Sequence, residues 1–127
     1  MVKLLYKQES YIIQGVAFDL YKQFRNRHKE KVYQKAFYYG LKDKNLEVNR
    51  EKRIDIYYNE RKVGTYTPDL AIDDKILIEL KLKLKLTLDD IKQFWYYLKN
   101  SNFKVGYLIN FGTSDGVQII RRVYGKL

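Results

Sequence analysis

Two carboxylates and a lysine are spaced so that a strand and a turn could bring them together. Asp69 follows the only proline of the chain, Glu79 lies ten residues after it, and Lys81 comes two positions later. Residues two apart on a β-strand point to the same face, so Glu79 and Lys81 should lie side by side. A turn at residues 73–75 would fold the preceding strand back and carry Asp69 to the same place.

This trio predicts metal-assisted hydrolysis of a phosphodiester. Two carboxylates held close together repel each other unless a cation lies between them. Mg²⁺ prefers such oxygens and keeps water molecules that a substrate phosphate can replace, and Mn²⁺ is its natural substitute. The ion would lower the pKa of a bound water, and Lys81 could orient that nucleophile or stabilise the charge that builds up on the phosphoryl group.

The composition removes most other kinds of active site. The chain has no cysteine and one histidine, His28, which excludes disulfide frameworks, thiolate metal sites and sites built from several histidines. Serine catalysis has no support, because no serine lies in a nucleophile-elbow context. With 25 lysines and arginines against 15 acidic residues, the net charge of +10 favours an anionic partner such as nucleic acid, phosphate or an acidic membrane surface.

The lengths of the apolar runs indicate where in the cell the protein is located. None approaches the length that spans a membrane, and the first ten residues, MVKLLYKQES, lack the apolar core of a signal peptide. A basic protein at an acidic membrane would need a strongly amphipathic basic helix, which we do not find. We therefore expect a cytoplasmic protein without membrane attachment, with nucleic acid as its partner and DNA favoured over RNA. At 127 residues, the whole of 1–127 should form one domain.

The apolar spacing changes from helical to alternating after residue 44 and returns to helical near residue 88. It predicts helices over residues 9–24, 30–42 and 88–99, with Ser10 as a cap for the first and either Thr87 or Asp89 for the third. Alternating or continuous apolar runs predict strands over residues 46–58, 63–72, 76–84, 104–111 and 117–124. The order ααβββαββ is typical of an α/β fold with a mixed sheet flanked by helices.

The stretch around the carboxylates resembles a known family pattern. Pro68-Asp69, nine intervening residues and then Glu79-Leu80-Lys81 are similar to the motif of the PD-(D/E)xK nuclease superfamily, which includes restriction endonucleases, Holliday-junction resolvases and RecB-type exonucleases. The segment from Gln93 to Tyr97 resembles the QxxxY motif of the RecB-like branch, and it falls on the helix where that branch carries it. The resemblance implies a restriction-endonuclease-like fold.

A second set of matches resembles the GxxExxY protein family, a small-protein branch of the same superfamily. Glu30-Lys-Val-Tyr33, followed by Ala36, is similar to its signature, and Val105 to Gly112 is similar to its late strand. The leading glycine of that signature corresponds to Arg27 here. If that glycine serves a turn with positive φ, this chain must enter the helix by another backbone path. Together the resemblance covers about Tyr11 to Tyr124.

The resemblance implies a role for each matched residue. Asp69 and Glu79 would bind the metal together with the backbone carbonyl of Leu80, and Lys81 would be the catalytic lysine. Glu30 would be an additional acidic ligand or a water anchor. The residues that border the site and touch the substrate would be Tyr33, Gln93 and Tyr97, with Gln93 also in the catalytic set.

Apart from any resemblance, the sequence contains a run of cations that could neutralise phosphates. We call it the basic cluster, and Glu30 lies within it. Its members are Lys22, Arg25, Arg27, Lys29, Lys31 and Lys35.

Each candidate residue also has a plainer interpretation. Glu79 could be a polar residue on an exposed edge strand, although a charge on a buried strand calls for a partner. Glu30 could simply favour the start of its helix, and Gln93 and Tyr97 have the spacing of any half-buried helix face. The lysines that follow the trio, Lys83 and Lys85, should be solvated.

The function also has an alternative from another class. The chain could be a non-catalytic nucleic-acid-binding module that keeps the fold and acts as a subunit of a larger complex. The presence of all three of Asp69, Glu79 and Lys81 favours the enzyme. The form of the substrate, endonuclease or exonuclease action, the pairing of two copies into a homodimer and the number of metal ions stay open.

Overall fold

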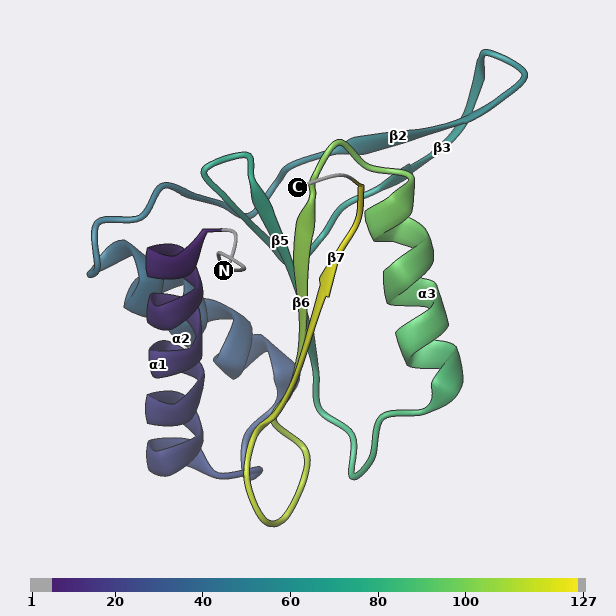
Figure 1. Ribbon diagram of the computed structural model, residues 1–127. Helices are drawn as coiled ribbons and strands as arrows, with labels where there is room; N and C mark the ends of the chain where they lie inside the picture. The colour runs from purple at the N-terminus through teal and green to yellow at the C-terminus, as the bar shows by residue number, and fades with distance from the viewer. Residues whose placement is uncertain (1–5, 126–127) are drawn as a thin grey trace, which may run out of the picture.

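The computed structural model describes residues 6–125 as a mixed sheet with helices on both faces. Figure 1 shows α1 and α2 on one side of the sheet and α3 on the other. In chain order the elements are α1 (Lys7–Phe24), α2 (Glu30–Lys42), β1 (Val48–Asn49), β2 (Ile54–Tyr58), β3 (Arg61–Tyr66), β4 (Leu70–Ile72), β5 (Ile76–Lys81), α3 (Leu88–Lys99), β6 (Val105–Asn110) and β7 (Gln118–Val123).

Five strands form the main sheet, in the order β1-β4-β5-β6-β7. The central strands β5 and β6 pair in parallel and are connected through α3, whereas the neighbouring pairs in the described part of the sheet are antiparallel. The strands β2 and β3 form a separate two-stranded hairpin. A parallel pair buried on both faces reads as a continuous apolar run, which is the pattern of Ile76–Ile78 and of β6.

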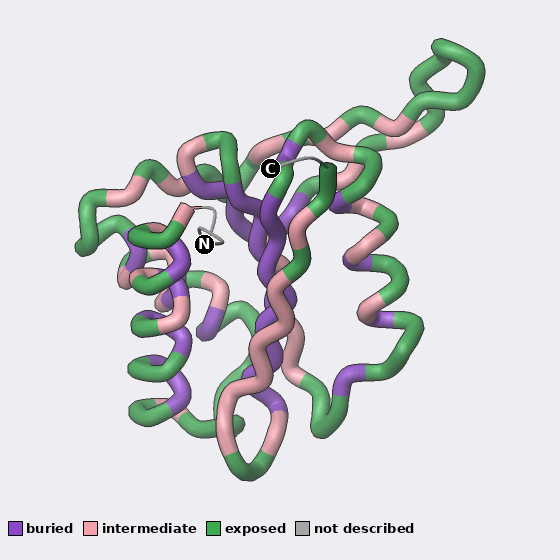
Figure 2. Tube along the Cα trace, viewed as in Figure 1, coloured by how far each residue is buried: buried purple, intermediate pink, exposed green. Residues whose placement is uncertain are grey.

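The core has two parts because side chains alternate across β5. Ile76, Ile78 and Leu80 pack with α1 and α2, whereas Leu77 packs with α3. Figure 2 shows buried residues along the central strands and exposed ones at the tip of the hairpin. Alternation then places Glu79 and Lys81 on the α3 side of the sheet, at the carboxyl end of β5.

The predicted α/β class with a mixed sheet and flanking helices is confirmed. The helices over residues 30–42 and 88–99 have the predicted bounds. Thr87 rather than Asp89 caps α3, in a capping box with Asp90. The cap predicted at Ser10 is wrong, because α1 begins at Lys7 and the buried Ser10 hydroxyl bonds to the Tyr107 hydroxyl instead.

Two predicted strands are each divided in the structure, so the described residues form seven strands instead of five, and two of the seven make a separate hairpin. The run 46–58 becomes β1 in the main sheet and β2 in the hairpin, and the run 63–72 becomes β3 and β4. The second break lies at residues 67–69, where Pro68 supplies no N–H for a ladder bond. The strand β5 ends at Lys81 and not at residue 84.

None of the helices within residues 6–125 is long and apolar enough to cross a membrane.

Candidate active site

The β4–β5 turn brings Asp69 and Glu79 into contact. In the register of these strands Leu70 pairs with Ile78, so the next residues outward on the two strands are neighbours. The backbone N–H of Asp69 donates a hydrogen bond to Oε1 of Glu79 at 3.2 Å, and the N–H of Leu80 donates to Oδ2 of Asp69 at 2.7 Å. The Glu79 carboxylate is therefore held by the backbone of Asp69, and the Asp69 carboxylate by the backbone of Leu80, the residue after Glu79.

The surroundings of Glu79 disfavour the negatively charged form of its carboxylate. Burial raises its pKa to about 7, with the negative charge of Asp69 adding to the rise. Hydrogen bonds from the Tyr66 hydroxyl and the Asp69 N–H, together with the charge of Lys81, oppose that rise. Within residues 6–125 its Oε2 receives no hydrogen bond, and this oxygen is not fully buried, because no fully buried side-chain oxygen there lacks a partner. This oxygen is therefore available to bind a cation.

Asp69 has a second partner, from α2. The Gln34 side-chain amide donates to Oδ1 of Asp69 at 3.1 Å. Burial raises the pKa of Asp69, while the Leu80 N–H and the charge of Lys81 oppose the rise. Gln34 was not among the predicted site residues, although its position four residues after Glu30 on the same helix was a signal for it.

Glu30 faces the same site from the first turn of α2. Partial burial raises its pKa, and the charge of Asp69 adds to the rise, with Lys81 and Lys83 opposing. Arg27, which corresponds to the glycine of the family signature, does not have the backbone conformation that favours glycine. The positive φ in the connection between α1 and α2 belongs to Arg25, at 53°, and Arg27 has none.

A cavity of about 200 Å³ opens between β5, the end of β3 and α3. Glu79 and Lys81 contribute to its lining, and no ion pair within 4 Å engages the Lys81 ammonium among the described residues. Gln93, which is exposed, and Tyr97 line the cavity from α3. Gln93 and Tyr97, both predicted site residues, therefore line the same cavity as Glu79 and Lys81.

Tyr66 is a further cavity residue that the sequence analysis did not identify. Its ring stacks on that of Tyr97, with centroids 3.8 Å apart and planes 7° from parallel. Its hydroxyl donates to Glu79, and burial, followed by the charge of Glu79, raises the pKa of that hydroxyl. No motif carries this residue, and its position three residues before Asp69 was the available signal.

Hydrogen bonds with the Asn110 side chain fix the backbone of the segment after β5. The buried Asn110 side chain accepts from the Lys83 N–H at 2.9 Å and from the Gly112 N–H at 3.0 Å, and donates to the Lys83 carbonyl at 2.8 Å. A Cβ at Gly112 would lie 2.2 Å from the Lys83 nitrogen, so only glycine permits this approach. Lys83 leaves the ladder here, which explains why β5 stops at Lys81.

Lys83 is exposed, as predicted, but it also forms an ion pair that the sequence did not indicate. Its ammonium lies 2.7 Å from Oδ1 of Asp90, and this hydrogen bond, followed by one from the Thr87 N–H, lowers the pKa of Asp90 to about 2. The partner sits on the first turn of α3, so the pair fixes that helix beside the cavity. Lys85 is exposed, as predicted.

The basic cluster is exposed throughout, around the connection between α1 and α2. Tyr33, which we expected to contact nucleic acid, is 1 % exposed, and that prediction is wrong. Its ring stacks on Phe111 with centroids 4.7 Å apart, and its hydroxyl donates to the Arg25 carbonyl. The side chain thus shapes the connection that presents the cations.

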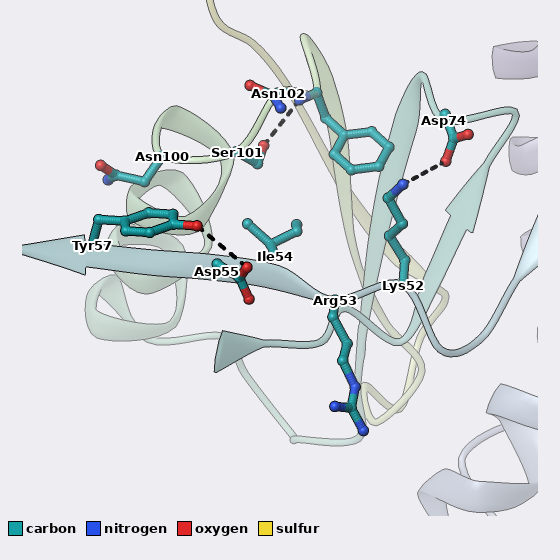
Figure 3. Close-up of a pocket in the computed structure, with 10 residues that line it drawn as sticks. Lys52, Arg53, Ile54, Asp55, Tyr57, Asp74, Asn100, Ser101 and Asn102 are labelled. Carbon is teal, nitrogen blue, oxygen red and sulfur yellow. Dashed lines mark hydrogen bonds and ion pairs between the residues drawn. The ribbon is translucent and has the colours of Figure 1, made fainter. Parts of the chain in front are cut away.

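A larger cavity of about 610 Å³ lies elsewhere, between β2 and the turn after α3. Figure 3 shows Lys52 reaching toward Asp74, at 3.1 Å, while Arg53 points away from them. Asp55 in its wall is paired with Lys62 at 3.2 Å. Most of its charges are neutralised within the chain, and it contains none of the predicted site residues.

No group of three or more His, Cys, Asp or Glu side chains close enough to hold a metal occurs within residues 6–125. Glu30 is therefore not joined with Asp69 and Glu79 in a three-carboxylate cluster. The pair itself suits a hard cation: two carboxylates with raised pKa values adjoin, and Oε2 of Glu79 accepts no hydrogen bond from the described residues. A divalent ion on such a pair completes its shell with water.

Comparison with known proteins gives the family. Searches of curated proteins and of solved structures found no significant match. A sequence profile of the PD-(D/E)XK nuclease superfamily matches residues 7–123, which is nearly the whole chain. That superfamily characteristically uses divalent metals and acts on nucleic acid. The chain belongs to the PD-(D/E)XK nuclease superfamily.

Proposed function

We propose that this protein is a Mg²⁺-dependent nuclease that hydrolyses phosphodiester bonds of DNA, with Mn²⁺ able to replace Mg²⁺. The observation that carries the proposal is the contact between Asp69 and Glu79 beside a cavity that also contains Lys81. Family membership supports it, and the spacing of Asp69, Glu79 and Lys81 in the sequence resembles the motif of that superfamily.

The roles follow from the surroundings of each side chain. Asp69 and Glu79 hold the ion with the Leu80 carbonyl, and a bound divalent ion supplies an acidified water and neutralises charge on the phosphoryl group. Lys81 makes no ion pair in the described structure, so its ammonium is free to orient the attacking water or to stabilise the transition state. Glu30 anchors a water near Asp69.

Substrate binding is assigned to two surfaces. Gln93 and Tyr97 line the cavity on the α3 side and contact the sugar-phosphate backbone of the strand that is cut. The exposed basic cluster, Arg25, Arg27, Lys29 and Lys31 included, neutralises phosphates further along the nucleic acid. These contacts depend on charge and should weaken as salt is added.

A matched pair of lysine variants tests catalysis. Labelled single-stranded, duplex and branched DNA and RNA would be incubated with the protein in Mg²⁺, Mn²⁺ or EDTA, together with Lys81→Gln and Lys85→Gln. Both changes remove one positive charge, but only Lys81 lines the cavity. We expect metal-dependent cleavage that falls by at least about 100-fold in Lys81→Gln and stays normal in Lys85→Gln. Binding without cleavage in every condition would instead support the non-catalytic module.

A further inference from the structure

The β2–β3 hairpin is an arm that stands away from the rest of the molecule (Figure 1). All residues from 57 to 63 are exposed, and Figure 2 shows the whole tip in that class. Its apolar side chains are open to solvent to an unusual degree: Tyr57 is 61 %, Tyr58 69 % and Val63 63 % exposed. Large side chains gathered on a projecting element mark an interaction surface.

The arm is preformed. Tyr58 pairs with Arg61, so the loop contains only Asn59 and Glu60, with φ angles of 48° and 67°. Two successive positive φ angles belong to the primed hairpin turns, whose twist matches that of the strands. At the base of the arm, Ile54 packs on the α3 side of the core. A partner therefore meets a narrow, ordered ribbon.

The arm starts at the candidate active site. Tyr66, the last residue of β3, lines the cavity and bonds to Glu79. Arg61 lies five residues back along β3, which is about 17 Å at 3.3 Å per residue. That length equals about five base steps of 3.4 Å. A substrate that leaves the cavity in this direction passes within reach of the tip.

The charges of the arm favour an anionic partner. Lys62 is paired with Asp55 at 3.2 Å, but neither Arg61 nor Arg53 forms an ion pair with any residue in the described part of the chain. The net charge of +10 acts in the same sense. Beside Arg61, the exposed ring of Tyr58 can pack against sugars and base edges. The combination of a free guanidinium and an open aromatic ring suits nucleic acid.

The shape of the arm selects one form of nucleic acid. The major groove of B-form DNA is about 12 Å wide and admits a two-stranded β-ribbon, whereas that of an A-form RNA duplex is too narrow. We propose that the β2–β3 hairpin enters the major groove of duplex DNA about five base pairs from the bond to be cut, with Arg61 on a phosphate. This inference rests on the proposed nuclease function and makes duplex DNA its substrate.

The test measures binding without turnover. In EDTA, the affinity for a 24-base-pair duplex DNA, a single strand and an RNA duplex of the same sequence would be compared across salt concentrations. The variants are Arg61→Gln, Tyr58→Ala and, as a matched control, Lys44→Gln, which removes one exposed charge in the turn after α2. All three side chains are exposed, so the melting temperatures should agree.

We expect Arg61→Gln to weaken duplex DNA binding by about five- to tenfold and to reduce the slope of log affinity against log salt by about one, with no such change in Lys44→Gln. Tyr58→Ala should weaken duplex DNA binding as well, and RNA duplex binding should respond little to either arm variant. Equal affinities for Arg61→Gln and Lys44→Gln would overturn the inference. So would a dimer in the native protein that Tyr58→Ala dissociates, because the tip would then be a protein interface.

Parallel cleavage assays in Mg²⁺ separate this inference from the proposed function. Normal cleavage with arm-independent binding refutes the arm alone. Arm-dependent binding without cleavage refutes the nuclease and leaves the DNA-binding arm in place.

Discussion

Without a metal ion, the carboxylate of Glu79 should make the protein less stable at pH 8 than at pH 5. Its pKa rises from an ordinary 4.5 to about 7 on folding, chiefly through burial. An acid with a raised pKa in the folded state favours folding while it is protonated. That contribution is complete below about pH 4.5 and is lost as the pH rises through about 7.

The size of this loss follows from the change in proton affinity. At about 1.4 kcal/mol for each tenfold change, it is about 3 kcal/mol for Glu79, or about 10 °C in melting temperature for a chain of this length. Asp69 and Glu30 act in the same direction, because their pKa values are also raised. The opposite shift of Asp90 lies below about pH 4 and does not enter this window.

The assay is urea unfolding in EDTA between pH 5 and pH 8, for the native protein and for Glu79→Gln. Glutamine keeps an oxygen for the Tyr66 and Asp69 donors but cannot ionise. We expect the free energy of unfolding of the native protein to fall by about 2–3 kcal/mol more than that of the variant, because part of the loss has already occurred at pH 5. Mg²⁺ at a hundred times its dissociation constant should restore about 2.7 kcal/mol at pH 8. Identical pH dependence in the two proteins would refute the electrostatic account of Glu79.

Two further substitutions probe the parts that position the site. Gly112→Ala should cost about 3 kcal/mol or more in unfolding free energy, because its Cβ would lie 2.2 Å from the Lys83 backbone. Gly15→Ala, on the open face of α1, should instead stabilise by up to about 1 kcal/mol, and chemical denaturation that ranks the two alike would contradict the packing argument. Tyr66→Phe should weaken Mn²⁺ binding in calorimetry by about tenfold, since the ring stack stays and the hydroxyl that orients Glu79 is lost. Unchanged Mn²⁺ affinity would mean that the hydroxyl does not position the carboxylate.

The sequence predicted the elements whose patterns are local. Period-two spacing placed Glu79 beside Lys81, and a short turn placed Asp69 beside Glu79, because both depend only on residues within one hairpin. The two-strand reading of residues 46–72 failed, because alternation looks the same whether a strand joins the main sheet or a separate arm. The break at Pro68 was visible in the sequence, but which sheet each half joins depends on tertiary packing.

The residues that hydrogen-bond to the site residues could not be predicted from the spacing of residues in the sequence. Gln34, Tyr66 and Asn110 act through contacts with residues far away in the chain, and no periodicity encodes such pairs. The prediction that Tyr33 contacts nucleic acid was wrong for a related reason. A tyrosine in a basic helix can face either solvent or the core, and here its ring packs on Phe111. Burial decided its role, and local sequence does not determine burial for an amphipathic side chain.

The most direct test of the central claim measures metal binding and DNA cleavage in the same samples. Mn²⁺ titration calorimetry and cleavage of a labelled duplex would be run on the native protein, on Asp69→Asn and on Asp115→Asn, which removes one exposed carboxylate in the loop before β7. The account predicts that Asp69→Asn loses both Mn²⁺ binding and metal-dependent cleavage, while Asp115→Asn retains both. Undiminished Mn²⁺ binding and cleavage in Asp69→Asn would contradict it.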